Sequence, residues 1–235
     1  MDEKYQRLKE IVESKLKGAS LAHDMGHVMR VYELCLYLAE SEPTADLNVL
    51  KTATLLHDIA RMRESREVDH ALLGAEMAEK ILKDLAYPEE EIQRVKHCII
   101  AHRFKGEKKP ETMEAQILSD ADKLDALGAI GIARCFVLAG EYLEKIYSDA
   151  PIEEYVKQNL TGGRCGGRIK DLSKHAPNIE FETKLKRIPR RLYTLRAREI
   201  GRERLAFMEQ FFQRLEKEIK GRSWIQPGSF SPAES

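Results

Sequence analysis

The sequence predicts an all-α protein. Apolar residues recur every three or four positions in one segment after another, which is the spacing of amphipathic helices, whereas strictly alternating runs are scarce. Hydrophobic residues make up 43% of the 235 residues and charged residues 33%, with few aromatic ones, a composition typical of a helix-rich globular chain. A chain of this length can form one large helical domain. We therefore expect a single domain over residues 1–222.

The expected helices begin and end at capping and breaking residues. Asp46 precedes one periodic apolar segment, Pro88 with the three following glutamates begins another, and Pro189 interrupts the last one. The helices are expected at residues 2–17, 27–41, 47–62, 70–85, 88–102, 114–139, 152–160 and 181–220, the last broken near Pro189. Residues 161–178 predict a long irregular connection, a kind of loop that is often functional in a compact domain. Residues 223–235 predict a flexible tail.

Charge and cysteine content exclude several classes of protein. The 39 basic residues balance 39 acidic ones, so no overall field draws the chain to nucleic acid or anionic lipid. No run of about 18 apolar residues occurs, and the charged amino-terminal segment lacks the apolar core of a signal peptide. The four scattered cysteines form no Cys-x-x-Cys pair, which is typical of reduced packing residues. We expect a cytoplasmic protein with no membrane association and no stable nucleic-acid partner.

The dipeptide His-Asp occurs twice, in LAHDMGHVMRV and in LLHDIAR. In the first stretch, His27 shares a helical face with Val31 and Leu38, which turns its ring toward the core. A lone buried histidine is most simply a neutral ring bonded to a backbone carbonyl. In the second stretch, His57 and Asp58 lie in an apolar helix, where a buried carboxylate needs a cation or strong donors.

A third segment, ILSDADKLDALGAIGIAR, places Asp122 and Asp125 on one apolar helical face. Two imidazoles and two carboxylates from three segments form a mixed nitrogen and oxygen ligand set, typical of Mn, Fe, Mg, Co or Ni. The spacing excludes a cysteine-rich structural zinc site. The alternative is a set of unrelated buried polar residues, and the coincidence of three such segments favours a divalent metal centre.

These segments resemble the HD-domain metal-dependent phosphohydrolases, whose pattern is a histidine, then His-Asp, then a distal aspartate. The resemblance covers residues 21–140, with His27 in GHVMRV, His57 and Asp58 in LLHDIAR, and Asp122 in SDADKLDALG. The phrases DADKLDALGAIGIAR, FETKL and FMEQFF are similar to a small stand-alone bacterial and archaeal subgroup. The resemblance implies an HD-domain helical bundle in which His27, His57, Asp58 and Asp122 hold the metal.

Other residues have more than one expected role around this centre. His23, four residues before His27, is expected either as a proton donor or phosphate contact at the rim, or as a solvated ring beside a capping Asp24. Asp125 could orient a ligand or the attacking water, and Asp58 could share a proton with that water.

Two carboxylates already balance the charge of a divalent ion. Other cations are therefore needed to neutralise the negative charge of a phosphate substrate and its transition state. Arg30 and Lys123, which lie close in sequence to the expected ligands, are the candidates for binding phosphate. The alternative for each is a solvated or structural charge. The segment 184–204 carries nine basic residues against two acidic ones and could bind polyphosphate or nucleic acid, but its charges are spread around a helix with leucines at packing positions.

His70 in HALLG and His102 in AHRF raise the question of a second metal, which some related HD proteins hold with histidines in comparable places. The cyclic-dinucleotide branch of the superfamily has a histidine pair where this chain has AHRF, and this chain lacks the GYP signature of that branch. We expect one metal, with His70, His102 and Arg103 contacting the substrate or the ligands.

The sequence and the resemblance together predict a metal-dependent phosphohydrolase. Its substrate is expected to be a nucleotide or another small phosphate ester, and the subgroup resemblance implies cleavage of a nucleoside triphosphate with release of pyrophosphate or phosphate. A di-iron oxygenase on the same fold would need His70 and His102 as ligands. A non-catalytic nucleotide-binding protein would keep the metal without turnover. A homodimer formed through the carboxy-terminal helix stays open.

Overall fold

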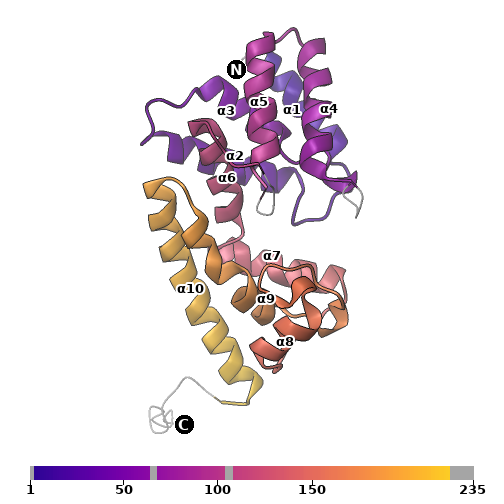
Figure 1. The fold of residues 1–235 in the computed structure, drawn as a ribbon, viewed down its shortest axis with the longest axis vertical. Helices are drawn as coiled ribbons and strands as arrows, with labels where there is room; N and C mark the ends of the chain where they lie inside the picture. Colours follow the sequence, from indigo (N-terminus) through magenta and orange to yellow (C-terminus); the bar gives the residue numbers. More distant parts are fainter. Residues whose placement is uncertain (1–2, 64–67, 104–107, 223–235) are drawn as a thin grey trace, which may run out of the picture.

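The computed structural model describes residues 3–63, 68–103 and 108–222, and these residues are helical with no β-strand (Figure 1). The prediction of an all-α fold is confirmed. The α-helices are α1 (Glu3–Lys15), α2 (Met25–Ala39), α3 (Leu47–Leu56), α4 (His70–Asp84), α5 (Glu89–Ala101), α6 (Met113–Asp125), α7 (Gly128–Glu141), α8 (Ile152–Asn159), α9 (Pro177–Thr183) and α10 (Leu195–Ile219). No described helix is both long enough and apolar enough to pass through a bilayer.

The first six helices enclose most of the main core, which continues into α7, α9 and α10. Helices α2, α3, α5 and α6 pack against one another, α4 lies along α5, and α1 covers α3. Their apolar faces bury Leu38, Leu50, Leu55, Ile99 and Leu118 almost completely, so the packing of these faces stabilises the arrangement. Helix α6 leads from this upper group in Figure 1 to the lower group of α7 to α10.

Helix α10 is fixed to α6 through a buried carboxylate. Asp120 of α6 accepts hydrogen bonds from the backbone N–H groups of Tyr193 and Thr194, at 2.9 Å and 2.8 Å, and from the Thr194 hydroxyl at 3.0 Å. These donors lie just before the first turn of α10, where helical N–H groups lack intrahelical partners. One fully buried side chain therefore connects the helix that carries Asp122 to the carboxy-terminal helix.

The expected helix over 114–139 is two helices, and that prediction was wrong. Helix α6 ends at Asp125 and α7 starts at Gly128, whose φ is +73°, a conformation that favours glycine. At Gly131 a Cβ atom would lie 2.3 Å from the carbonyl oxygen of Ala126, so the junction also requires a glycine there. The two glycines of LGAIGIAR therefore let the chain change direction directly after α6.

Two other expected helices are also divided. The helix expected over 47–62 ends at Leu56, and a turn followed by the 3₁₀ segment Arg61–Arg63 carries the chain onward. The helix expected over 181–220 is divided into α9, the 3₁₀ segment Leu185–Arg191 and α10, in agreement with the break near Pro189. Because Pro189 lacks an N–H donor, a short 3₁₀ segment replaces a continuous α-helix there.

The expected connection at 161–178 is more ordered than an irregular loop. Two 3₁₀ turns, Thr161–Gly163 and Leu172–Lys174, and a bridge between Leu160 and Ile169 shape it. His175, within this connection, is buried and bonds to the Tyr155 hydroxyl at 2.7 Å. The expected tail at 223–235 lies outside the described residues.

Candidate metal centre

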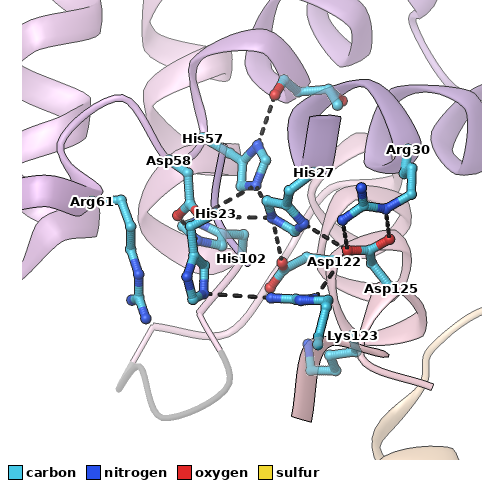
Figure 2. Close-up of polar contacts among 12 residues, drawn as sticks. His23, His27, Arg30, His57, Asp58, Arg61, His102, Asp122, Lys123 and Asp125 are labelled. Carbon is cyan, nitrogen blue, oxygen red and sulfur yellow. Dashed lines mark hydrogen bonds and ion pairs between the residues drawn. The ribbon is translucent and has the colours of Figure 1, made fainter. Parts of the chain in front are cut away.

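The predicted ligand residues converge on one point between α2, α3 and α6 (Figure 2). The Nε2 atom of His27 lies 3.3 Å from Nε2 of His57, 3.6 Å from Oδ2 of Asp58 and 3.5 Å from Oδ1 of Asp122. His27 and His57 are fully buried, whereas the Asp122 side chain keeps 24% of its surface exposed. Asp122 therefore marks the side from which a ligand can approach.

Each histidine of this cluster has one ring nitrogen occupied by the protein. Nδ1 of His57 lies 2.7 Å from the Thr54 carbonyl oxygen, and Nδ1 of His27 lies 2.7 Å from Oδ2 of Asp125. A proton on each Nδ1 leaves Nε2 with a free lone pair facing the centre. This is how metal-binding histidines are normally fixed, with a carbonyl or carboxylate behind the ring. The donor set thus fits a divalent cation.

Local chain geometry presents these side chains. Asp24 caps α2, and its carboxylate accepts the N–H of His27 at 3.0 Å, which places His27 in the first turn. His57 follows the last residue of α3, and the chain then turns, so that Asp58 extends from a turn and not from a helix. The two neighbours therefore reach the same centre from a helix end.

The electrostatics of the cluster favour a positive charge at its middle. Burial opposes a charge on His27, yet its hydrogen bonds to Asp122 and Asp125 raise its pKa to about 9. Burial likewise opposes a charge on Asp122, but the hydrogen bond to His27 lowers the pKa of that carboxyl group. The carboxylates thus stabilise a cation beside Nε2 of His27. A divalent ion bound between these carboxylates would be stabilised by the same negative charge that stabilises a proton on His27.

Asp58 also faces a second group of histidines. Its Oδ1 atom lies 3.4 Å from Nε2 of His70, at the start of α4, and 3.8 Å from Nε2 of His102, at the end of α5. Nδ1 of His102 lies 2.5 Å from the Ile99 carbonyl oxygen, which leaves its Nε2 facing Asp58. The two oxygens of Asp58 thus face different histidine pairs, and His70, His102 and Asp58 could hold a metal ion of their own.

Asp125 lies behind His27 and binds two arginines. Its Oδ1 accepts from Nε of Arg30 at 2.8 Å, and its Oδ2 accepts from Nη2 of Arg30 at 3.0 Å and from Nη1 of Arg134 at 2.9 Å. These hydrogen bonds, with that of His27, lower the pKa of the Asp125 carboxyl group against the effect of burial. Asp125 therefore fixes the orientation of the His27 ring, and its role toward a metal stays a prediction.

The side chain of Arg134 also reaches the rim. Its Nη2 lies 3.4 Å from Nε2 of His23, whose ring packs edge to face against that of His27 with centroids 5.8 Å apart. Burial and the charge of Arg61 lower the pKa of His23 to about 3, so the ring is neutral. His23 is therefore packed at the rim of the centre, while Asp24 is the helix cap.

The side chains that the sequence predicts to bind phosphate make other contacts in the structure. Lys123 is buried, donates to the Ser119 carbonyl at 2.9 Å and also contacts the Ser119 hydroxyl. Burial lowers the pKa of its ammonium group. The fork of Arg30 is bound to Asp125, and Arg103 pairs with Asp69, which caps α4.

Most side chains of the basic segment 184–204 also serve the fold. Lys184 and Lys186 pair with glutamates one turn away, at 2.6 Å and 2.8 Å. Arg196 binds the Tyr37 carbonyl and Glu40, while Arg204 donates to the Leu124 carbonyl at 2.7 Å. Arg187 and Arg198 donate to the carbonyls of Glu182 and Leu192, so at least six of the nine basic side chains make contacts within the protein, which favours the structural interpretation of the segment.

Replacing Asp125 tests whether its carboxylate holds the His27 ring in position for metal binding. An Asp125→Asn variant keeps the shape but loses the charge that holds the His27 ring, so we expect its affinity for Mn²⁺ to fall about 10-fold to 100-fold. Calorimetric titration of the metal-free chain measures this change. An Asp24→Asn variant is the matched control, because asparagine caps helices about as well as aspartate and its affinity should change by less than about threefold. Equal affinities in wild type and Asp125→Asn would contradict the assigned role.

Comparison with known proteins agrees with this geometry. Residues 24–127, which span all the predicted ligands, match the HD domain family model. The chain is 33% identical over 220 residues to the uncharacterized protein YpgQ of Bacillus subtilis, covering 92% of this chain and 94% of YpgQ. A second relative, the 3'-5' exoribonuclease YhaM of Bacillus pumilus, is 30% identical over 140 residues, which cover 52% of this chain and 44% of YhaM.

Two crystal structures share the fold over nearly the whole chain. That of Bacillus subtilis YpgQ in complex with ADP has a TM-score of 0.69 at 30% identity and covers 93% of this chain and 96% of that one. That of an HD-superfamily hydrolase from Bacillus thuringiensis has a TM-score of 0.68 at 28% identity and covers 94% of this chain and 98% of that one. The chain belongs to the HD-domain hydrolase family.

Proposed function

We propose that this protein is a metal-dependent phosphohydrolase that acts on nucleotides, and that it cleaves a phosphoanhydride bond of nucleoside triphosphates. The observation that supports this most strongly is the convergence of His27, His57, Asp58 and Asp122 on one point that is open at Asp122. The crystal structure of the relative YpgQ contains ADP, which supports a nucleotide as the ligand of this chain too.

The proposed metal ligands are His27, His57, Asp58 and Asp122. A mixed imidazole and carboxylate set accepts Mn²⁺, Mg²⁺, Fe²⁺, Co²⁺ or Ni²⁺, and cellular supply selects among them. When bound, such an ion lowers the pKa of a water molecule and polarises a phosphate oxygen.

The protein itself would position and neutralise the reacting groups. His57 and His27 are held by the Thr54 carbonyl and by Asp125, so their lone pairs need no reorganisation. Asp58, nearly inaccessible to solvent, is the carboxylate best placed to accept a proton from an attacking water molecule, because its Oδ1 is directed away from His27. His23 and Arg134 line the same rim and would contact the phosphate chain.

The group of Asp58, His70 and His102 favours one alternative, an oxygenase with two irons. That chemistry requires both groups to be filled with iron, whereas the proposed hydrolysis requires only the first. The likeness to YhaM raises a second alternative function, the cleavage of RNA phosphodiesters. Structural use of most of the basic segment 184–204 argues against an extended nucleic-acid surface.

The purified chain should be assayed with Mn²⁺, Mg²⁺, Co²⁺ and Ni²⁺ against nucleoside mono-, di- and triphosphates and a short single-stranded RNA. We expect metal-dependent conversion of triphosphates, with the released pyrophosphate or phosphate identified by anion-exchange chromatography. Release of nucleotides from RNA with triphosphates untouched would replace the proposal by an exonuclease. Two irons per chain with no phosphate release would point to the oxygenase.

A further inference from the structure

The surroundings of Asp125 hold more positive than negative charge. Its single carboxylate faces the guanidinium groups of Arg30 and Arg134 within 3.0 Å. The remaining donor to this carboxylate is Nδ1 of His27, which brings no negative charge. Two arginines thus share one carboxylate, and one positive charge is left without a counterion among these groups.

Arg134 bears that excess charge. Arg30 uses a two-point fork on Asp125 and leaves 34% of its side chain exposed, so water can solvate the rest of its charge. The Arg134 side chain is only 14% exposed and makes one bond to Asp125. Its Nη2 faces the ring of His23, which carries no negative charge, and its Nε is buried without a hydrogen-bond partner in the part of the chain that the structure describes. Buried charges and donors of this kind are costly unless a ligand satisfies them.

The guanidinium group of Arg134 lies near the candidate metal centre. Nη1 of Arg134 contacts Oδ2 of Asp125, the same atom that lies 2.7 Å from Nδ1 of His27, so the guanidinium is linked to His27 through one carboxylate oxygen. Arg134 also contacts His23, which lies at the rim of the centre (Figure 2). An anion that is bound to the metal and extends past His27 would therefore meet the guanidinium group.

We propose that Arg134 is a specificity-determining residue that binds the phosphoryl group next to the one on the metal, and so selects phosphoanhydrides over monophosphates. The inference rests on the proposed function, since it places the reacting phosphate on the metal. Guanidinium is suited to the task because its planar donors match phosphate oxygens at two points. A monophosphate bound to the metal would lack the second phosphoryl group and would leave Arg134 unsatisfied.

Binding of two small probes to the full, Mg²⁺-loaded chain tests the proposal without turnover. The probes are inorganic phosphate and imidodiphosphate, a pyrophosphate analogue whose bridging nitrogen resists hydrolysis. In Arg134→Gln we expect the Kd of imidodiphosphate to rise about 10-fold to 100-fold, since a charge-assisted contact is lost, while the Kd of phosphate changes by less than about threefold. Calorimetry measures both. Arg134→Lys, which keeps the charge but loses the fork, should give an intermediate value and is the variant to use if the glutamine variant does not fold.

Arg30→Gln is the matched control, because Arg30 binds the same carboxylate. If Arg134 acted only by holding Asp125 and His27, both variants would weaken metal binding and both probes alike, and the proposal would be overturned. Equal loss of phosphate and imidodiphosphate binding in Arg134→Gln would overturn it too. A chain that binds imidodiphosphate through Arg134 but hydrolyses no nucleotide would refute the proposed function alone. Triphosphate hydrolysis with an unchanged KM in Arg134→Gln would refute only the inference.

Discussion

Asp58→Asn is expected to reduce metal-dependent nucleotide hydrolysis by about a thousandfold or more. An ion held at this centre would supply several kcal/mol of stabilisation to the transition state, and each 1.36 kcal/mol is a factor of ten in rate. The substitution retains the shape of the side chain while removing the negative charge that lies 3.6 Å from Nε2 of His27. The assay compares initial rates of triphosphate hydrolysis at saturating Mn²⁺, and elemental analysis of the same samples reports metal content.

Glu114→Gln is the matched control for the loss of a buried carboxylate. Glu114 belongs to α6, the helix of Asp122, and is as buried as Asp58, but it binds Arg94 and the backbone N–H of Asp46 away from the metal centre. We expect this variant to lose thermal stability and to keep its turnover per folded molecule within about threefold, because surface and core changes away from a site act through stability. Similar activity losses in the two variants would mean that Asp58 acts through the fold and not through a metal.

The sequence was sufficient to predict which residues form the cluster because these residues stand where a polar group is out of place. His27, His57 and Asp58 interrupt apolar segments, and burial of such groups without a partner is costly. That argument needs only local periodicity, which the structure confirms in the buried faces of α2, α3 and α6. The junction at Gly128 was missed, since a glycine inside a periodic segment is compatible with either a continuous helix or a break.

The junction between α6 and α7 also explains why periodicity does not predict the contact between Arg134 and Asp125. Counted along one continuous helix, Arg134 lies nine residues after Asp125 and about 180° away from it, so the two side chains would point in opposite directions. The chain changes direction between α6 and α7, and this brings the guanidinium to 2.9 Å from the carboxylate. Lys123 shows the converse. It is next to the predicted ligand Asp122 in sequence, yet its ammonium group binds Ser119 one turn back along its own helix.

His70 and His102 lie beyond what periodicity can place, because their relation to Asp58 depends on how α4 and α5 pack. His70 begins α4 and His102 directly follows α5. Because α4 and α5 pack against each other, the two rings meet with centroids 5.5 Å apart. Sequence could list them as candidates for contact with the centre, and the structure adds that both face the same oxygen of Asp58. Whether this second group binds an ion follows from charge as well as from position. Asp58 would have to share its single negative charge between two divalent ions.

Metal stoichiometry is therefore expected to be one divalent ion per chain, lost in His57→Ala and kept in His102→Ala. Asp58 and Asp122 both face Nε2 of His27, so two carboxylates would balance one ion there, whereas the group of Asp58, His70 and His102 has no second carboxylate among the described residues. Elemental analysis after dialysis against Mn²⁺ or Fe²⁺ gives the count for each variant. The two variants are matched, because both rings are buried and both bind a backbone carbonyl through Nδ1. Two ions in wild type and one in His102→Ala would instead make Asp58 a bridging ligand. The activity measured with one ion and with two would then tell whether the second ion takes part in hydrolysis or serves the oxygenase chemistry.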